Sequence, residues 1–153
     1  MADLHRRAQV SQAANDRYLV ALASVIGSNS LHQEAASVCQ PVLYRARRYR
    51  GLNPLCDQDY ALLRAVNQGQ FLLSGLRNSD LRAVLYKPAK DPLLRRRHTA
   101  AVTRKLTMLR AHGLLRKIPH SHLYQLTPKG RRIITALLAA CHADVEQLTK
   151  LAA

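Results

Sequence analysis

Threonine, alanine and arginine recur at helical spacing in a stretch from His98 to Gly130 that contains no acidic residue. Arginine forms paired hydrogen bonds with guanine, and the methyl groups of threonine and alanine contact the methyl group of thymine. Five residues at this spacing are therefore expected to contact base edges: Thr99, Ala100, Thr103, Arg104 and Thr107. For Arg104, contact with a phosphate group is an open alternative.

The cations around these residues are better suited to a phosphate backbone. Lysine and arginine contacts to phosphate add affinity but carry no sequence information. The residues assigned to this role are Arg95, Arg96, Arg97, Lys105 and Arg110. Three further residues, Lys117, His120 and His122, are expected on a β-hairpin, where they contact the backbone or the minor groove.

The whole chain is strongly basic. Its 153 residues include 24 Lys and Arg against 9 Asp and Glu, which gives a formal net charge of +15. Residues 92–143 contain no acidic residue, and a second basic run at residues 45–50 precedes them. Self-repulsion of this kind favours an anionic partner. A generally basic surface without such a partner is the alternative.

A helix, a hairpin and a second helix must position these side chains. One helical face is apolar, formed by Val102, Leu106, Leu109 and Gly113. Gly113 also tolerates the positive φ of a helix end. Two short strands flank a turn at residues 119–122, and Thr127 followed by Pro128 caps and starts the next helix. The predicted fold is mostly α (α+β): a winged helix-turn-helix with a small β-hairpin wing and flanking N- and C-terminal helices.

The sequence before residue 98 predicts further helices. Their expected ranges are 3–26, 30–38, 57–67 and 79–86, the last one capped by Asn78. Residues 42–50 alternate in a way that favours an extended arm or strand, and residues 71–76 favour a short strand or tight link. Residues 87–97 contain two prolines and are expected to form a basic loop. The predicted domains are an extension and basic arm at 1–52, a winged helix at 53–140 and a helical extension at 141–153.

Two resemblances add to this interpretation. Residues 101–115 and 124–130 resemble the recognition helix and wing of MarR- and ArsR-type winged-helix regulators, which implies a DNA-binding fold. Residues 15–138 are similar to the C-terminal region of long bacterial proteins associated with mobile elements. This second likeness is carried by residues 48–53, 69–71, 75–78 and 80–82. It implies no activity, only that such a module can sit behind a larger partner domain. The loop at 87–97 is longer than the MarR pattern.

Catalytic and cofactor chemistry have no clear residues in this sequence. The sequence contains no nucleophile paired with a base at a known spacing and no glycine-rich phosphate loop. Asp57 and Asp59 fit charges in the first turn of a helix. The pairs His120/His122 and Cys141/His142 match no standard zinc spacing. We therefore expect a protein that is not an enzyme and that holds no metal or cofactor.

The cellular setting is predicted from cysteine usage and hydropathy. The three cysteines form no CxxC pair, which favours a reducing compartment. No apolar run approaches the roughly 20 residues that a membrane span needs, and the N-terminus lacks an apolar signal core. The expected location is cytoplasmic, without membrane contact.

The expected function is sequence-specific binding of double-stranded DNA, in transcriptional regulation. RNA is an alternative partner, although aromatic residues make up only 5% of the chain and the candidate stacking residues are Tyr44, Tyr49 and Tyr124. Docking to a larger mobile-element protein is another alternative. An apolar stripe favours a homodimer seam: Ile134, Leu138, Cys141, Val145 and Leu148. The opposing interpretation is that both terminal helices pack on their own monomer.

Overall fold

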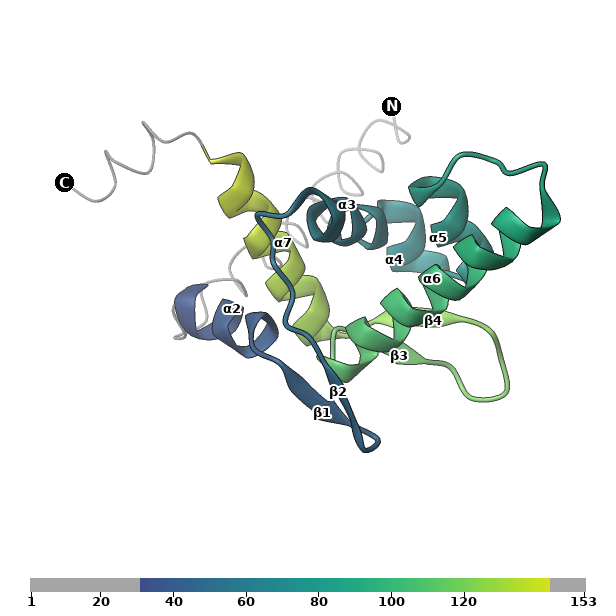
Figure 1. Cartoon of the computed structure of the whole chain (residues 1–153). Coiled ribbons are helices and arrows are strands. Elements are labelled where there is room, and N and C mark those ends of the chain that lie inside the picture. The colour runs from purple at the N-terminus through teal and green to yellow at the C-terminus, as the bar shows by residue number, and fades with distance from the viewer. Residues whose placement is uncertain (1–30, 144–153) are drawn as a thin grey trace, which may run out of the picture. The chain divides into compact units, whose positions relative to one another are not determined.

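Six helices and two antiparallel hairpins make up residues 31–143, the part of the chain that the computed structural model describes (Figure 1). The helices are α2 (Leu31–Cys39), α3 (Asp57–Val66), α4 (Gly69–Ser74), α5 (Asn78–Leu85), α6 (Pro92–Ala111) and α7 (Pro128–His142). The strands are β1 (Val42–Tyr44), β2 (Arg47–Tyr49), β3 (Leu115–Lys117) and β4 (Tyr124–Leu126). The expected helix at residues 3–26 lies outside the described residues.

The core joins α3, α5, α6 and α7 in a winged-helix-like arrangement. The apolar face predicted for α6 is buried, since Val102, Leu106 and Leu109 are at most 1% exposed. Other fully buried side chains come from the surrounding helices: Leu62, Leu63, Leu81, Ile133 and Ile134. The predicted fold class, mostly α with a small β-hairpin, is confirmed.

The wing is the hairpin of β3 and β4, in which Leu115 pairs with Leu126. Leu76 adds a short third strand, because it exchanges two backbone hydrogen bonds of 2.8 Å with Tyr124. Gly75 precedes it with φ of 75°, and a Cβ at this position would lie 2.8 Å from the Tyr124 carbonyl oxygen. The strand expected at residues 71–76 is therefore wrong except at its end, since the preceding residues form α4 with Phe71 buried.

The loop expected at residues 87–97 is also wrong in its second half. The carboxylate of Asp91 accepts a hydrogen bond from the Leu93 amide at 3.0 Å, and Pro92 occupies the first helical position. Proline suits this position because its missing N–H would have no partner there. The helix α6 thus begins at Pro92, and the connection from α5 to α6 spans only residues 86–91.

Most of the local helix signals are confirmed. The expected helices at 30–38 and 57–67 correspond to α2 and α3. Gly113 ends α6 with φ of 71°, and the Thr127 hydroxyl accepts from the Gly130 amide at 2.9 Å at the start of α7. The cap of α5 differs from the prediction. Asn78 is its first helical residue and Arg77 precedes it as the cap residue, while Asp80 accepts from the Arg77 amide at 2.8 Å.

The extended arm expected at residues 42–50 folds back on itself as the hairpin of β1 and β2. Its register pairs Val42 with Tyr49 and Tyr44 with Arg47. Arg45 and Ala46 make the turn with φ of 50° and 60°. This left-handed pair is the geometry of a two-residue hairpin turn that matches the twist of its strands.

Residues 31–52 pack with the rest of the described chain. Val38 and Leu52 belong to the core, and the Leu52 amide donates to the Val38 carbonyl at 2.9 Å. An ion pair between Arg132 and Glu34 joins α7 to α2. The expected division between residues 52 and 53 is therefore no packing boundary, and residues 31–143 lie within one compact unit. The helix α7 likewise continues past residue 140 to His142.

Gly51 offers a test of this junction. A Cβ at Gly51 would lie 1.8 Å from the Cys39 carbonyl oxygen, so Gly51→Ala forces the end of α2 away from the hairpin. We expect it to lower the free energy of unfolding by about 1–3 kcal/mol, as overpacking does. Urea denaturation measures this loss. Gly69→Ala is the matched control, because nothing lies within 4 Å of its added methyl group. Equal stability of the two variants would contradict the packing described.

Candidate nucleic-acid interface

The helix α6 presents its polar face away from the core. Ala100, Thr103 and Arg104 are exposed, whereas Thr99 and Thr107 are half-buried. Figure 1 shows α6 running diagonally from the 86–91 connection down to the base of the wing. The side chains predicted to contact bases thus lie between the second and the fifth turn of a longer helix than the sequence suggested.

Five predicted contact residues line one open hollow of about 510 Å³. They are Arg95, Arg96, Thr99, Ala100 and Thr103. The other lining residues, Ala89, Lys90 and Pro92, come from the connection and the start of α6. Cations, hydroxyl groups and methyl groups therefore meet on one surface, which suits an anionic ligand with an apolar edge. Arg104 and Thr107 lie outside this hollow.

Arg95, Arg96 and Arg97 belong to the first two turns of α6 instead of a loop. The positive end of a helix dipole lies at its N-terminus, so cations in these turns are electrostatically unfavourable. All three side chains are exposed, and Asp91 is the nearest acid in sequence. An anion bound at this end of α6 would remove the unfavourable term.

The threonines of α6 form a ladder of internal hydrogen bonds. The hydroxyl groups of Thr99, Thr103 and Thr107 donate to the carbonyl groups four residues earlier, at 2.8–2.9 Å. Their hydroxyl protons are therefore engaged within the helix. What these side chains still offer to a ligand is a methyl group and, where no other donor binds it, an oxygen acceptor.

Two residues of α5, Asn78 and Arg82, support this ladder, although the sequence predicted only a helix cap for Asn78 and no role for Arg82. Arg82 donates to the Thr99 hydroxyl oxygen at 2.7 Å. Asn78 donates to the Thr103 hydroxyl oxygen at 3.0 Å and to the Thr99 carbonyl at 3.1 Å. The spacing of Asn78 and Arg82, four residues apart on a helix, is a signal that could have placed both on the face toward α6.

Lys105 and Arg110 contact aromatic rings of the protein. The Lys105 ammonium group lies 5.8 Å from the centre of the Tyr86 ring, which itself stacks on His98 at 4.3 Å. Arg110 donates to the Tyr44 hydroxyl group at 3.3 Å. Both predicted phosphate contacts are therefore half-buried and held in place, in contrast to the exposed arginines at the start of α6.

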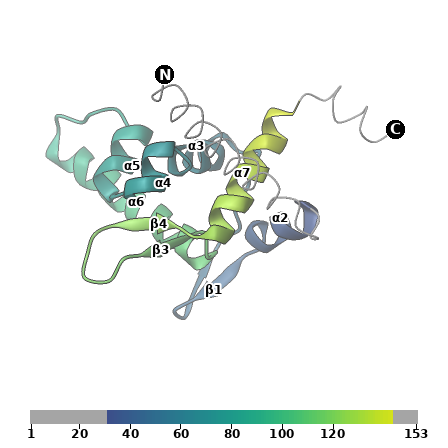
Figure 2. The ribbon, with the colours of Figure 1, turned by 180° about the vertical axis from the view of Figure 1, so that it is seen from behind.

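The wing residues lie where the sequence placed them. Lys117 is exposed at the end of β3, and His120 and His122 are exposed in the turn, where His120 has φ of 55°. The Ser121 hydroxyl group donates to the Ile118 carbonyl at 3.0 Å and accepts from the Leu123 amide at 3.2 Å, which orders the turn. Figure 1 and the reverse view in Figure 2 both show the two hairpins projecting at the lower edge, with α3 at the upper side.

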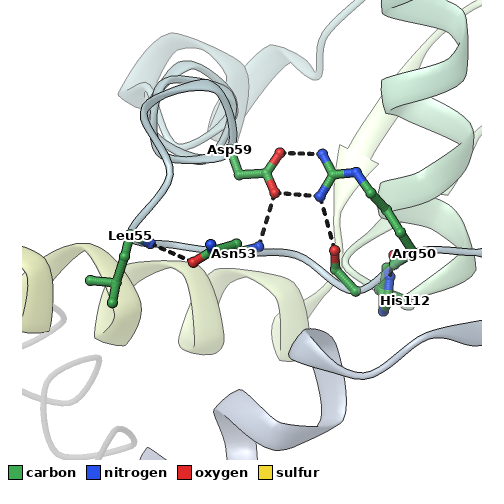
Figure 3. Close-up of polar contacts among 6 residues, drawn as sticks. Arg50, Asn53, Leu55, Asp59 and His112 are labelled. Atoms are coloured by element: carbon green, nitrogen blue, oxygen red, sulfur yellow. Dashed lines mark hydrogen bonds and ion pairs between the residues drawn. The ribbon is translucent and has the colours of Figure 1, made fainter.

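An ion pair between the exposed Arg50 and the buried Asp59 fixes the hairpin of β1 and β2 at its base (Figure 3). Both terminal nitrogens of the Arg50 guanidinium, Nη1 and Nη2, donate to the Asp59 carboxylate at 2.6 Å, and the backbone amide of Asn53 donates to it at 2.9 Å. The Arg50 carbonyl oxygen is 2.9 Å from Nε2 of His112, at the end of α6. Asp59 lies in the first turn of α3, as predicted, but its side chain is only 4% exposed and is also paired with Arg50, which the sequence did not predict.

The environment of Asp59 changes its pKa. Burial alone would raise this pKa, but hydrogen bonds from Arg50 and the Asn53 amide, with the charges of Arg50 and Lys105, hold it below its ordinary value. The hydrogen bond with Asp59 raises the pKa of Arg50 in turn. The pair thus remains ionised at neutral pH and connects β2, α3 and α6.

The histidines and cysteines of the described chain do not gather into a metal site. Within residues 31–143, no three His, Cys, Asp or Glu side chains lie together in a way that could hold an ion. His142 instead hydrogen-bonds the Tyr60 hydroxyl group at 2.6 Å, and the Cys141 thiol contacts the Pro54 carbonyl at 3.7 Å. The same residues include no helix with the length and apolar character to cross a membrane.

Comparisons with protein families, curated proteins and solved structures found no match to this chain. The interpretation of the interface therefore depends on its geometry and charge. The similarity to MarR- and ArsR-type regulators and to mobile-element proteins stays a prediction from the sequence.

Asp59→Asn tests the ion pair. Because the folded-state pKa of Asp59 is lowered, its contribution to stability is fully present above the unfolded pKa of about 3.9 and is lost as pH falls through the folded value. We expect the variant to lose about 1–3 kcal/mol of unfolding free energy at pH 7. The difference from the native protein should stay constant down to about pH 5 and shrink below about pH 4. Urea unfolding at several pH values measures it.

Asp57→Asn is the control for this prediction. Asp57 is an exposed acid in the same helical turn, so its replacement should cost much less stability. A difference between native protein and Asp59→Asn that is the same at pH 3 and pH 7 would contradict the role given to the ion pair.

Proposed function

We propose that this protein binds double-stranded DNA in a sequence-specific manner and acts as a cytoplasmic transcriptional regulator. One observation carries the proposal: α6 exposes Ala100, Thr103 and Arg104 beside a cluster of arginines, on a stretch without acidic residues, and α5 packs behind it as in a helix-turn-helix. A major groove admits one α-helix with such a face. The wing then lies beside the helix, where it can contact the neighbouring backbone.

In this proposal, the side chains of α6 have different roles. Arg95, Arg96 and Arg97 neutralise phosphates and provide affinity that does not depend on sequence. Arg104 is exposed and contacts guanine or a phosphate. Ala100 and Thr103 supply methyl groups for thymine, since the Thr103 hydroxyl proton is engaged within the helix. Arg82 and Asn78 keep the ladder in place from α5.

The tyrosines favour duplex DNA over RNA as the partner. Tyr49 and Tyr124 are half-buried and pack against the core, so they are poor platforms for an unpaired base. Tyr44 already has Arg45 and Arg110 close to its ring. Readers of single-stranded RNA expose aromatic rings for stacking, and this surface offers mainly cations. In this proposal the protein has no catalytic role, and it needs no metal or cofactor to bind duplex DNA.

A homodimer remains a prediction. Ile134 and Leu138, the first residues of the apolar stripe, are buried by the protein's own core at 0% and 9% exposure. Val145 and Leu148 lie outside the described residues. A dimer seam would therefore have to use the stripe beyond Cys141. Sedimentation that shows a monomer at tens of micromolar would contradict the dimer.

Substitution of Arg104 and Arg96 separates base contact from phosphate contact. Fragments selected from a random duplex pool, with a structured-RNA pool alongside, supply the specific site. Arg104→Ala should weaken binding to this site by about 1–3 kcal/mol and random duplex by less. Arg96→Ala should weaken both equally and lower the salt slope by about 0.9. Equal losses on specific and random duplex for Arg104→Ala would instead assign Arg104 to a phosphate.

Salt dependence of the native protein tests the proposed function itself. Because released counterions drive phosphate binding, affinity for a mixed-sequence duplex should fall steeply between low and physiological salt. Fluorescence anisotropy with labelled duplex measures this slope. A protein-docking module would show little duplex affinity even at low salt, and selection of RNA alone from the paired pools would favour the RNA alternative.

A further inference from the structure

The hairpin of β1 and β2 carries a second cluster of cations, separate from α6 and the wing. Arg45, Arg47 and Arg48 are all exposed and stand at the turn or next to it. None of them has an ion pair with an acid of the described residues. Three like charges within four positions repel one another, so this hairpin is electrostatically unfavourable without an anionic partner.

Arginines from two elements meet at Tyr44. The guanidinium carbon of Arg45 lies 5.4 Å from the centre of the Tyr44 ring, and that of Arg110 lies 6.0 Å from it. Arg47 is directly opposite Tyr44 in the strand register. The ring therefore lies between a cation of the hairpin and a cation at the C-terminal end of α6.

The hairpin is fixed relative to α6 at its base. The Arg50 guanidinium is held by Asp59, and the Arg50 carbonyl contacts His112 at the end of α6. Tyr49 packs against the core, and its ring meets Tyr44 edge-on at 6.3 Å between centres. An arm whose base is held in this way presents its charges at a defined position and loses little conformational freedom on binding.

The turn residues are unusual for their conformation. A left-handed pair is most easily formed by Asn and Gly, yet Arg45 and Ala46 occupy it here. A residue with a Cβ costs roughly 1 kcal/mol or more in this region. The chain thus places a long cation at the tip in spite of the local backbone cost.

From these observations we propose that the β1–β2 hairpin is a second phosphate-binding arm, which contacts the duplex backbone beyond the C-terminal end of α6. The proposal rests on the proposed function, because it extends the same duplex interface. Arg45, Arg47 and Arg48 supply guanidinium groups, which bind phosphate oxygens through paired hydrogen bonds. Arg110 and Tyr44 keep the arm continuous with α6. The duplex is thereby held by two hairpins, the wing and this arm.

The test compares the native protein with the triple variant Arg45→Gln, Arg47→Gln, Arg48→Gln. The probe is a mixed-sequence duplex of about three helical turns, titrated by anisotropy over a range of salt. The variant should bind at least about tenfold more weakly, with a salt slope lowered by about 0.9 for each lost contact. The native protein should also need a longer duplex than the variant to reach its full affinity.

Two controls separate charge from structure. The variant Arg45→Lys, Arg47→Lys, Arg48→Lys keeps the three charges and should keep most of the salt slope. Arg64→Gln removes one exposed charge from α3, a helix that Figures 1 and 2 show on the opposite side of the core from the two hairpins, and should leave affinity and slope unchanged. Circular dichroism and thermal unfolding check that each variant is folded.

The outcomes distinguish this proposal from the proposed function. Native protein without duplex affinity overturns both. Native protein that binds duplex while the folded glutamine variant binds it equally, with the same slope, overturns the arm alone. Loss of affinity for a structured-RNA probe only, with duplex binding unchanged, assigns the hairpin to RNA and also overturns it. A loss in the glutamine variant that the lysine variant escapes supports the arm.

Discussion

The ion pair between Arg50 and Asp59 holds together the parts of the molecule that carry its charge. It joins the residue that follows β2 to α3, and the Arg50 carbonyl extends the connection to the end of α6 through His112. A buried carboxylate is costly unless it is paired. Here a protein with a large excess of cations uses one of its few acids to orient a hairpin, and the surrounding arginines remain on the surface.

The surface that results has two kinds of cation. Arg95, Arg96 and Arg97 are exposed at the start of α6, where the helix dipole disfavours them. Lys105 and Arg110 are held against aromatic rings further along the same helix. The first group can adapt to a ligand, whereas the second is preorganised. A duplex backbone that follows α6 would meet both, and the two hairpins adjoin the C-terminal end of the same helix.

Short-range patterns predicted the elements that position this surface. The apolar spacing of α6, the glycine at its end and the Thr127 cap are properties of a few neighbouring residues, and the structure has each of them. The role of Pro92 was harder to predict, because a proline can either interrupt a helix or occupy its first position. The hydrogen bond from the Leu93 amide to the Asp91 side chain shows that Pro92 begins α6.

Such short-range patterns could not predict contacts between elements that are distant in the sequence. Residues 71–73 form a short apolar run that fits a strand, but the six-residue helix α4 buries Phe71 just as well. The pairing of Asp59 with Arg50, and the support that Asn78 and Arg82 give to α6, depend on packing that no local rule contains.

The ladder of threonines on α6 has a consequence for chemically modified bases in a duplex. If α6 enters a major groove as proposed, a face that offers methyl groups in place of hydroxyl donors would favour thymine over uracil. It would also favour 5-methylcytosine over cytosine, because thymine and 5-methylcytosine both carry a methyl group at C5.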